Sequence, residues 1–151
     1  MQIISLEEIL LMQLEGKLNT NDDWNKLCKN YILNEKIIEK HKDKVDWDYI
    51  SAFQVLSESF IEKYKDRVNW YYISRYQTLS EEFINKYQDQ VDWTCISEYQ
   101  KLSEELINKH HDKVNWFCIS EYQKLSESFI DRYKDKVNWA YLNIKNYQKL
   151  L

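Results

Sequence analysis

Cysteine and histidine side chains are the residues of this 151-residue chain best suited to metal chemistry. Cys95 and Cys118 lie 23 residues apart, and His110 and His111 stand between them. A structural zinc site needs about four converging ligands, usually with short spacings between them. The two cysteines and His110 instead occupy positions that are tyrosine in similar segments of the chain. We interpret them as replacements for core aromatic residues, and we expect neither a metal nor another cofactor.

Acid–base catalysis is the second kind of chemistry that the charged residues could support. Charged residues make up 30% of the chain, and carboxylates such as Glu58 and Asp66 recur from segment to segment. A catalytic acid–base pair is set apart by its own environment, whereas these carboxylates repeat as surface or turn residues. No nucleophile–base signature accompanies them. We therefore expect a protein that is not an enzyme and has no small-molecule substrate.

The composition excludes several other classes of protein. The chain has no proline and one glycine, Gly16, which excludes glycine-rich phosphate loops, dinucleotide fingerprints and two-residue hairpins. Its 21 basic and 25 acidic residues are interspersed, so no cationic nucleic-acid surface stands out. Three unpaired cysteines and the lack of a basic leader predict an intracellular setting. No apolar run approaches the ~20 residues that span a bilayer, so we expect a soluble protein without a membrane partner.

The positions of the six tryptophans reveal a tandem repeat. Each successive pair is separated by 23 residues, which is the signature of a repeat architecture. The tryptophans are Trp24, Trp47, Trp70, Trp93, Trp116 and Trp139. The full units span 45–67, 68–90, 91–113 and 114–136, a degenerate unit spans 22–44, and a partial unit spans 137–142.

Each unit divides into two similar halves, and each half predicts one short helix. An apolar residue precedes an N-cap candidate, and aromatic, isoleucine and aromatic side chains follow at i, i+1 and i+4 on one helical face. The N-cap candidates are Asp46, Asn69, Asp92, Asn115 and Asn138 in the first halves and Ser57, Ser80, Ser103 and Ser126 in the second halves. Helices of about two turns are unstable alone and must stack unit on unit. We predict an all-α fold, an α-solenoid of short helix pairs with atypical capping helices at both ends.

The two ends of the chain depart from the repeat. Residues 1–21 predict an N-terminal capping helix that starts after Ser5 and ends near Leu14. Its apolar residues Leu6, Ile9, Leu10 and Leu14 are expected to cover the first unit. The repeat array spans 22–142, residues 143–151 form a C-terminal cap, and we expect a single domain overall. The cap could also seat a second copy through the candidate self-association residues Tyr141, Ile144, Tyr147 and Leu151.

Residues that recur at one position of the repeat receive structural interpretations. We predict that the tryptophans and the recurring tyrosines are core, and that Trp93 in the middle of the array matters more than Trp24. These tyrosines are Tyr64, Tyr76, Tyr87, Tyr99, Tyr122 and Tyr133. A glutamine column is expected to bond the turn backbone between halves, and a serine column to allow close helix contacts. The columns are Gln54, Gln77, Gln100 and Gln123, and Ser51, Ser74, Ser97 and Ser120.

Variable positions on one helix face are the candidate partner-binding surface. The residue after each tryptophan, and the residue four positions further on, change from unit to unit. Solenoids usually recognise partners through such positions, and aromatic and arginine side chains anchor interfaces. The candidate residues are Tyr71, Arg75, Phe117 and Glu121. We predict a protein that acts through protein–protein contact, with a protein partner or a second copy. Nucleic-acid binding is the alternative, which the net charge of −4 disfavours.

The repeat also resembles a known group of proteins. Units of the form V-[DN]-W-x-x-I-S-x-Y-Q-x-L-S-E-x-F-I-x-K-Y-x-D-x resemble tandem-repeat proteins of large DNA viruses of amoebae, in the mimivirus and marseillevirus groups. The resemblance covers 22–142 and does not extend to the terminal segments. It implies an intracellular viral product, in the host cytoplasm or packaged in the virion. The predicted protein–protein contacts would make such a product an adaptor, a scaffold or a structural virion component. The resemblance implies no activity, cofactor or catalytic residue.

Overall fold

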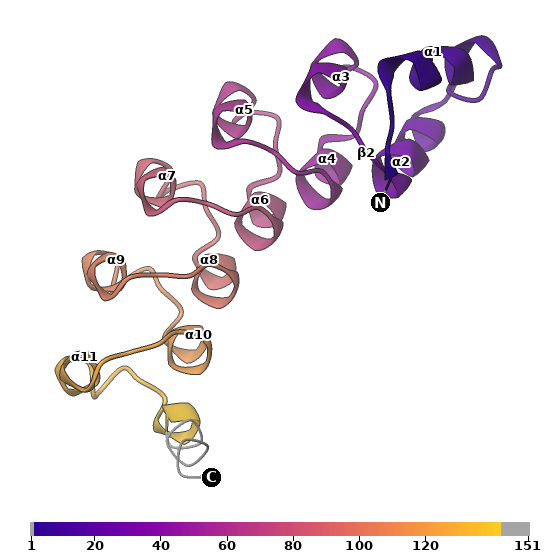
Figure 1. The fold of residues 1–151 in the computed structure, drawn as a ribbon. Helices are drawn as coiled ribbons and strands as arrows, with labels where there is room; N and C mark the ends of the chain where they lie inside the picture. Colours follow the sequence, from indigo (N-terminus) through magenta and orange to yellow (C-terminus); the bar gives the residue numbers. More distant parts are fainter. Residues whose placement is uncertain (1, 143–151) are drawn as a thin grey trace. The chain divides into compact units, whose positions relative to one another are not determined.

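The computed structural model describes residues 2–142, and within them the fold is an all-α helical-repeat solenoid with one short strand pair (Figure 1). This confirms the predicted fold class. The elements of the N-terminal half are β1 (Gln2–Ile3), α1 (Leu6–Leu14), α2 (Asn21–Asn30), β2 (Tyr31–Ile32), α3 (Glu35–Lys40), α4 (Trp47–Phe53), α5 (Glu58–Lys63) and α6 (Trp70–Tyr76). The elements of the C-terminal half are α7 (Glu81–Lys86), α8 (Trp93–Tyr99), α9 (Glu104–Lys109), α10 (Trp116–Tyr122) and α11 (Glu127–Arg132).

Side-chain caps set the start of every repeat helix. The Asn69 Oδ1 atom accepts hydrogen bonds from the backbone N–H groups of Tyr71 and Tyr72, at 3.1 and 3.4 Å. In the second half of a unit, Ser103 Oγ accepts from the Leu106 N–H at 3.1 Å. The other predicted cap residues lie at the same helix starts, and Asn138 caps a helical turn at residues 139–142. The expected caps are therefore confirmed, and they explain why helices of six or seven residues begin where they do.

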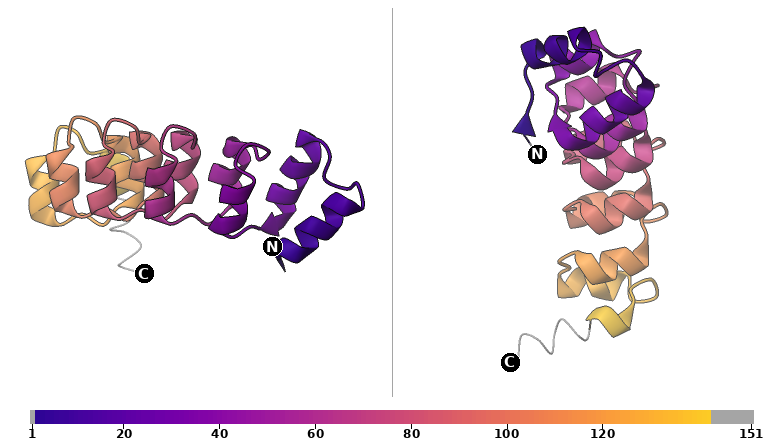
Figure 2. Two further views of the ribbon diagram at one scale, coloured as in Figure 1. Left: turned by 90° about the horizontal axis from the view of Figure 1, so that it is seen from above. Right: turned by 90° about the vertical axis from the view of Figure 1, so that its right-hand side faces the viewer.

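Isoleucine side chains make the most deeply buried layer. One isoleucine from the first helix of each full unit is fully buried, and so is one from most second helices. These residues are Ile50, Ile73, Ile96 and Ile119, and Ile38, Ile61, Ile84 and Ile107. Helix α4 contacts α6, and α8 contacts α10, so the two first helices of each pair lie side by side (Figure 1 and Figure 2). Stacking therefore supplies the burial that such short helices lack on their own.

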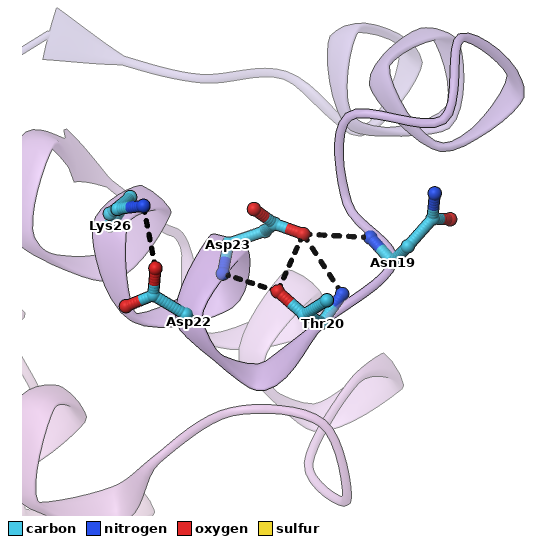
Figure 3. Close-up of polar contacts among 5 residues, drawn as sticks. All are labelled: Asn19, Thr20, Asp22, Asp23 and Lys26. Carbon is cyan, nitrogen blue, oxygen red and sulfur yellow. Dashed lines mark hydrogen bonds and ion pairs between the residues drawn. The ribbon is translucent and has the colours of Figure 1, made fainter.

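The degenerate first unit begins its helix earlier than the others. Its N-cap is Thr20, three residues before Asp23, which holds the usual cap position. Thr20 Oγ1 accepts from the Asp23 N–H at 3.2 Å, and Asp23 Oδ2 accepts from the Thr20 N–H at 2.9 Å (Figure 3). The Thr20 hydroxyl also donates to Asp23 Oδ2 at 2.7 Å, and this bond, followed by the one from the Thr20 N–H, lowers the pKa of Asp23. Asp22 replaces the valine that ends the turn elsewhere and pairs with Lys26 at 2.5 Å, so α2 extends to ten residues.

The N-terminal helix confirms its predicted boundaries but not its predicted packing. Ser5 caps α1 in a reciprocal box with Glu8, and hydrogen bonds from Ser5 lower the pKa of Glu8. Of the four apolar residues expected to cover the first unit, only Ile9 is buried, and Leu14 is 86% exposed. That expectation was wrong. The apolar side chains of α1 are spread around most of the helix circumference, and only one side of a helix can pack against its neighbour.

A two-stranded parallel pairing was not expected from the sequence. β1 pairs with β2, with Gln2 opposite Tyr31 and Ile3 opposite Ile32. The Ile4 N–H extends the pairing by donating to the Ile32 carbonyl at 3.2 Å. The N-terminal segment thus contacts the turn between the two helices of the first unit.

The chain divides into two compact units, Met1–Gln77 and Thr78–Leu151. The boundary lies between the two halves of the 68–90 repeat. The predicted single domain stays a prediction. The predicted cap at 143–151, with Ile144, Tyr147 and Leu151, lies outside the described residues.

Candidate functional site

The glutamine column joins each repeat to the one before it. Gln77 Nε2 donates to the carbonyl groups of Ser51 and Gln54 at 3.1 and 2.7 Å, and Gln77 Oε1 accepts from the Leu56 N–H at 3.0 Å. Gln54 and Gln123 each make the same three contacts with the repeat that precedes them, and all four glutamines are buried. The prediction that these glutamines bond the turn backbone between the two halves of a repeat is confirmed, and the turn that each one bonds belongs to the preceding repeat. The glutamine amides therefore stabilise the contact between neighbouring repeats.

Serine and glutamate side chains add a second set of inter-repeat bonds. Ser97 Oγ donates to the Trp93 carbonyl at 2.6 Å and accepts from the Asn115 N–H of the next unit at 3.0 Å. Glu81 accepts from the N–H and hydroxyl of Ser103 at 2.6 and 2.8 Å. The serines were expected only to be small, and the glutamate bridges were missed. The constant spacing of 22 residues between these glutamates and serines was the available signal.

The tryptophans cover the turns that join successive units. The indole Nε1 of Trp93 donates to the Gln88 carbonyl at 2.9 Å, and the Trp93 ring packs at a tilt against the His110 ring, with centroids 4.6 Å apart. Trp47 and Trp116 make the same pairings with Tyr64 and Tyr133. Such contacts hold the second helix of a unit against its first helix.

Burial of the tryptophans falls along the chain. Trp24 is 2% exposed and Trp47 is also buried, Trp93 is half-buried, and Trp139 is 48% exposed. The expectation that every indole is core was therefore wrong, and Trp24 in the degenerate unit is the most buried of the six instead of a minor one. An indole that covers a turn from outside keeps one edge in solvent unless other segments cover it.

The candidate metal ligands do not converge. Cys28, Cys95 and Cys118 are buried, and His110 Nε2 lies 2.7 Å from Asn85 Oδ1. Within residues 2–142, no three histidine, cysteine, aspartate or glutamate side chains are grouped to hold a metal ion. Burial raises the pKa of the Cys28 thiol to about 12, so this thiol is protonated and unreactive at neutral pH.

The buried histidines predict a loss of stability in mild acid. Burial, followed by nearby lysines, lowers the pKa of His41 and of His110. His41 Nε2 is buried with no hydrogen-bond partner among the described residues. Because the unfolded chain binds protons more readily than the folded chain, stability falls as the pH drops below about 6.5. We expect the melting temperature to be lower at about pH 5.5 than at about pH 7.5.

The control for this pH effect is the double variant H41Y/H110Y, which restores the residue found at Tyr64 and Tyr87. Thermal melts of both proteins at the two pH values compare their pH dependence. The variant should lose less stability on acidification than the original chain. An equal loss in both proteins would contradict a role for these two histidines.

The recurring tyrosines divide into two groups. Of the tyrosines that follow second helices, Tyr64 and Tyr87 are buried and Tyr133 is half-buried. The aromatic residues that end first helices are exposed: Phe53 by 37%, Tyr76 by 55%, Tyr99 by 43% and Tyr122 by 50%. The core prediction was wrong for these tyrosines. At 100° per residue, positions 0, 3, 4 and 7 from each tryptophan share the inner side of the helix, and position 6 lies on the other side. That angular count could have been made from the sequence.

The candidate surface residues lie on this outer side of the first helices. Tyr71 and Phe117 are exposed, and Arg75 and Glu121 are half-buried. An Arg75 guanidinium nitrogen donates to the Tyr71 hydroxyl at 3.0 Å. Phe117 packs edge-on against Tyr141 with centroids 4.8 Å apart, so Tyr141 lies on this face of the second unit.

A groove of about 550 Å³ lies on the outer side of α4 and α6. Its lining is aromatic and acidic, and all of it belongs to the first compact unit. The lining residues are Asp46, Asp48, Tyr49, Ala52, Phe53, Tyr72 and Tyr76. The groove thus combines four aromatic rings with two carboxylates.

Comparison with known proteins yields no match to a family model, a curated protein or a solved structure. The resemblance to viral repeat proteins therefore stays a prediction. None of the described helices is long and apolar enough to cross a membrane.

Proposed function

We propose that this chain is a non-enzymatic helical-repeat protein that binds another protein through the outer face of its first helices. The supporting observation is the exposed aromatic residue at one position of four successive repeats, Phe53, Tyr76, Tyr99 and Tyr122. Single exposed apolar residues are ordinary on a protein surface, but an exposed aromatic residue that recurs at the same position of successive repeats is not explained by chance exposure. Aromatic side chains are also enriched at the cores of interfaces.

The neighbouring charges favour a protein partner over nucleic acid. Glu98 and Glu121 lie one residue before Tyr99 and Tyr122, and Asp46 and Asp48 line the groove on α4 and α6. Carboxylates repel the phosphates that supply most nucleic-acid affinity. The proposed role is that of an adaptor or scaffold, and the viral resemblance would make it an intracellular or virion component. A second copy of the chain is the competing partner.

The test compares two quadruple variants as baits for protein capture. F53A/Y76A/Y99A/Y122A removes the exposed rings, and V55A/T78A/K101A/K124A changes another exposed position of the same repeats. We expect partners held by the original chain and the control to be lost from the ring variant. Equal capture by all three proteins would contradict the proposal. So would the absence of any captured partner together with strictly monomeric sedimentation, or a nucleic-acid mobility shift that weakens steeply with salt.

A further inference from the structure

The groove on α4 and α6 carries residues that the first helices of the second unit lack. Tyr49 and Tyr72 occupy the repeat position that is cysteine at Cys95 and Cys118. Asp48 occupies the position that is threonine at Thr94. The repeats of the second unit form the same helices with cysteine and threonine at these positions, so the stacking of repeats does not require the tyrosines and the aspartate, and their presence calls for another explanation.

Aromatic rings from both helices line the groove. Tyr49 and Phe53 on α4 have centroids 5.7 Å apart, and Tyr72 and Tyr76 on α6 have centroids 6.2 Å apart with nearly parallel rings. The Arg75 guanidinium lies 5.4 Å from the Tyr76 centroid. No cation of the described chain lies over the other three rings. Ring faces attract guanidinium and ammonium groups, most strongly when water is excluded.

Two carboxylates at the groove keep hydrogen-bonding capacity. Asp46 Oδ1 accepts from the N–H groups of Asp48 and Tyr49 at 2.8 and 3.4 Å. Asp48 Oδ1 accepts from Asn69 Nδ2 at 2.7 Å. Within the described residues, the Oδ2 atom of each carboxylate makes no hydrogen bond. Each carboxylate can therefore accept from a donor outside the chain without breaking a contact of the fold.

We infer that this groove binds an arginine-bearing segment of a partner protein, and this inference rests on the proposed protein-binding role. The guanidinium plane stacks on the open rings, and its N–H groups donate to the carboxylates of Asp46 and Asp48. A volume of about 550 Å³ accommodates the arginine side chain and parts of the flanking residues. The carboxylates disfavour a phosphate-bearing ligand for the same reason that they favour a basic one.

A fluorescein-labelled peptide of alternating arginine and serine is the probe, with binding to the full chain followed by fluorescence anisotropy. The variants use residues that the chain itself carries at the same repeat positions, so the fold tolerates them. D46N/D48T copies Asn69 and Thr94 and removes both carboxylates, and Y49C/Y72C copies Cys95 and removes two rings. We expect each double variant to weaken binding by about tenfold or more. The same peptide with glutamine in place of arginine should not bind.

Two controls separate the groove from general attraction to an acidic protein. E7Q/D66N changes the net charge as much as D46N/D48T but alters exposed sites elsewhere, and Y99A/Y122A alters the second unit. Binding by both controls should stay within about twofold of the original chain. Equal weakening by E7Q/D66N, or no arginine-peptide binding up to about 1 mM, would overturn the inference. So would displacement of the peptide by single-stranded RNA. Failure here, with partner capture still lost from the ring variant, would leave the proposed function standing.

Discussion

Replacing Trp24 with alanine is expected to lower the free energy of unfolding by about 3–5 kcal/mol, as large-to-small changes of buried aromatics do. Trp24 is buried, stacks on His41 with centroids 4.8 Å apart, and has the Lys44 ammonium 5.9 Å from its ring centroid. The alanine would leave a cavity between α2 and its neighbours. Urea unfolding followed by far-UV circular dichroism measures the effect.

Trp139→Ala is the matched control for this prediction. The same residue type sits at the same repeat position but is exposed, so its loss should cost less than about 1 kcal/mol. Trp93→Ala should fall between the two, because the Trp93 ring is half-buried. A larger loss for Trp93 than for Trp24 would contradict this order and favour a core centred on the middle of the array.

Replacing Gln54 with methionine is expected to cost about 3 kcal/mol or more. The amide satisfies the Leu33 N–H at 2.7 Å, the Tyr31 carbonyl at 2.9 Å and the Cys28 carbonyl. Methionine has a similar shape but leaves all three backbone groups without a partner in a buried place, and each unsatisfied group costs about 1–3 kcal/mol. Urea unfolding at neutral pH measures the loss.

Gln54→Glu sharpens this test. Glutamate keeps the acceptor for Leu33 but turns a charged oxygen toward two carbonyl groups, so its deficit relative to the original chain should shrink as the pH is lowered and the carboxyl group binds a proton. Gln90→Met, at an exposed position, should change stability by less than about 0.5 kcal/mol. Small effects from both Gln54 variants would contradict the role of the glutamine column in joining repeats.

Where the repeat helices begin can be predicted from local sequence, because the capping interactions that set the helix starts span only two or three residues. Asn69 and Ser103 cap helices through backbone groups two or three residues away, so their roles can be predicted from spacing alone. The glutamine column was likewise predictable as a structural feature, since it recurs in every full unit. The pairing of Gln2 with Tyr31 was not predictable, because two-residue strands carry little pattern and their register depends on distant packing.

The candidate site could be predicted only in part. Tyr71 and Arg75 were identified because they vary between units, and they contact each other on the outer side of α6. Tyr76 was assigned to the core because it recurs, although its angular position on the helix places it outside. Recurrence marks positions that do the same job in each unit, and that job can be exposure to a partner as well as burial.

Hydroxyl-radical footprinting of the free chain tests the outward aromatic face most directly. The side chains of Tyr76, Tyr99 and Tyr122 should be oxidised rapidly, whereas those of Tyr64 and Tyr87 should be protected, and all five are the same residue type in the same chain. Comparing identical rings removes differences in intrinsic reactivity. Equal oxidation of both groups, or faster oxidation of Tyr64 and Tyr87, would contradict the assignment of the first helices' outer side as the working surface of this protein.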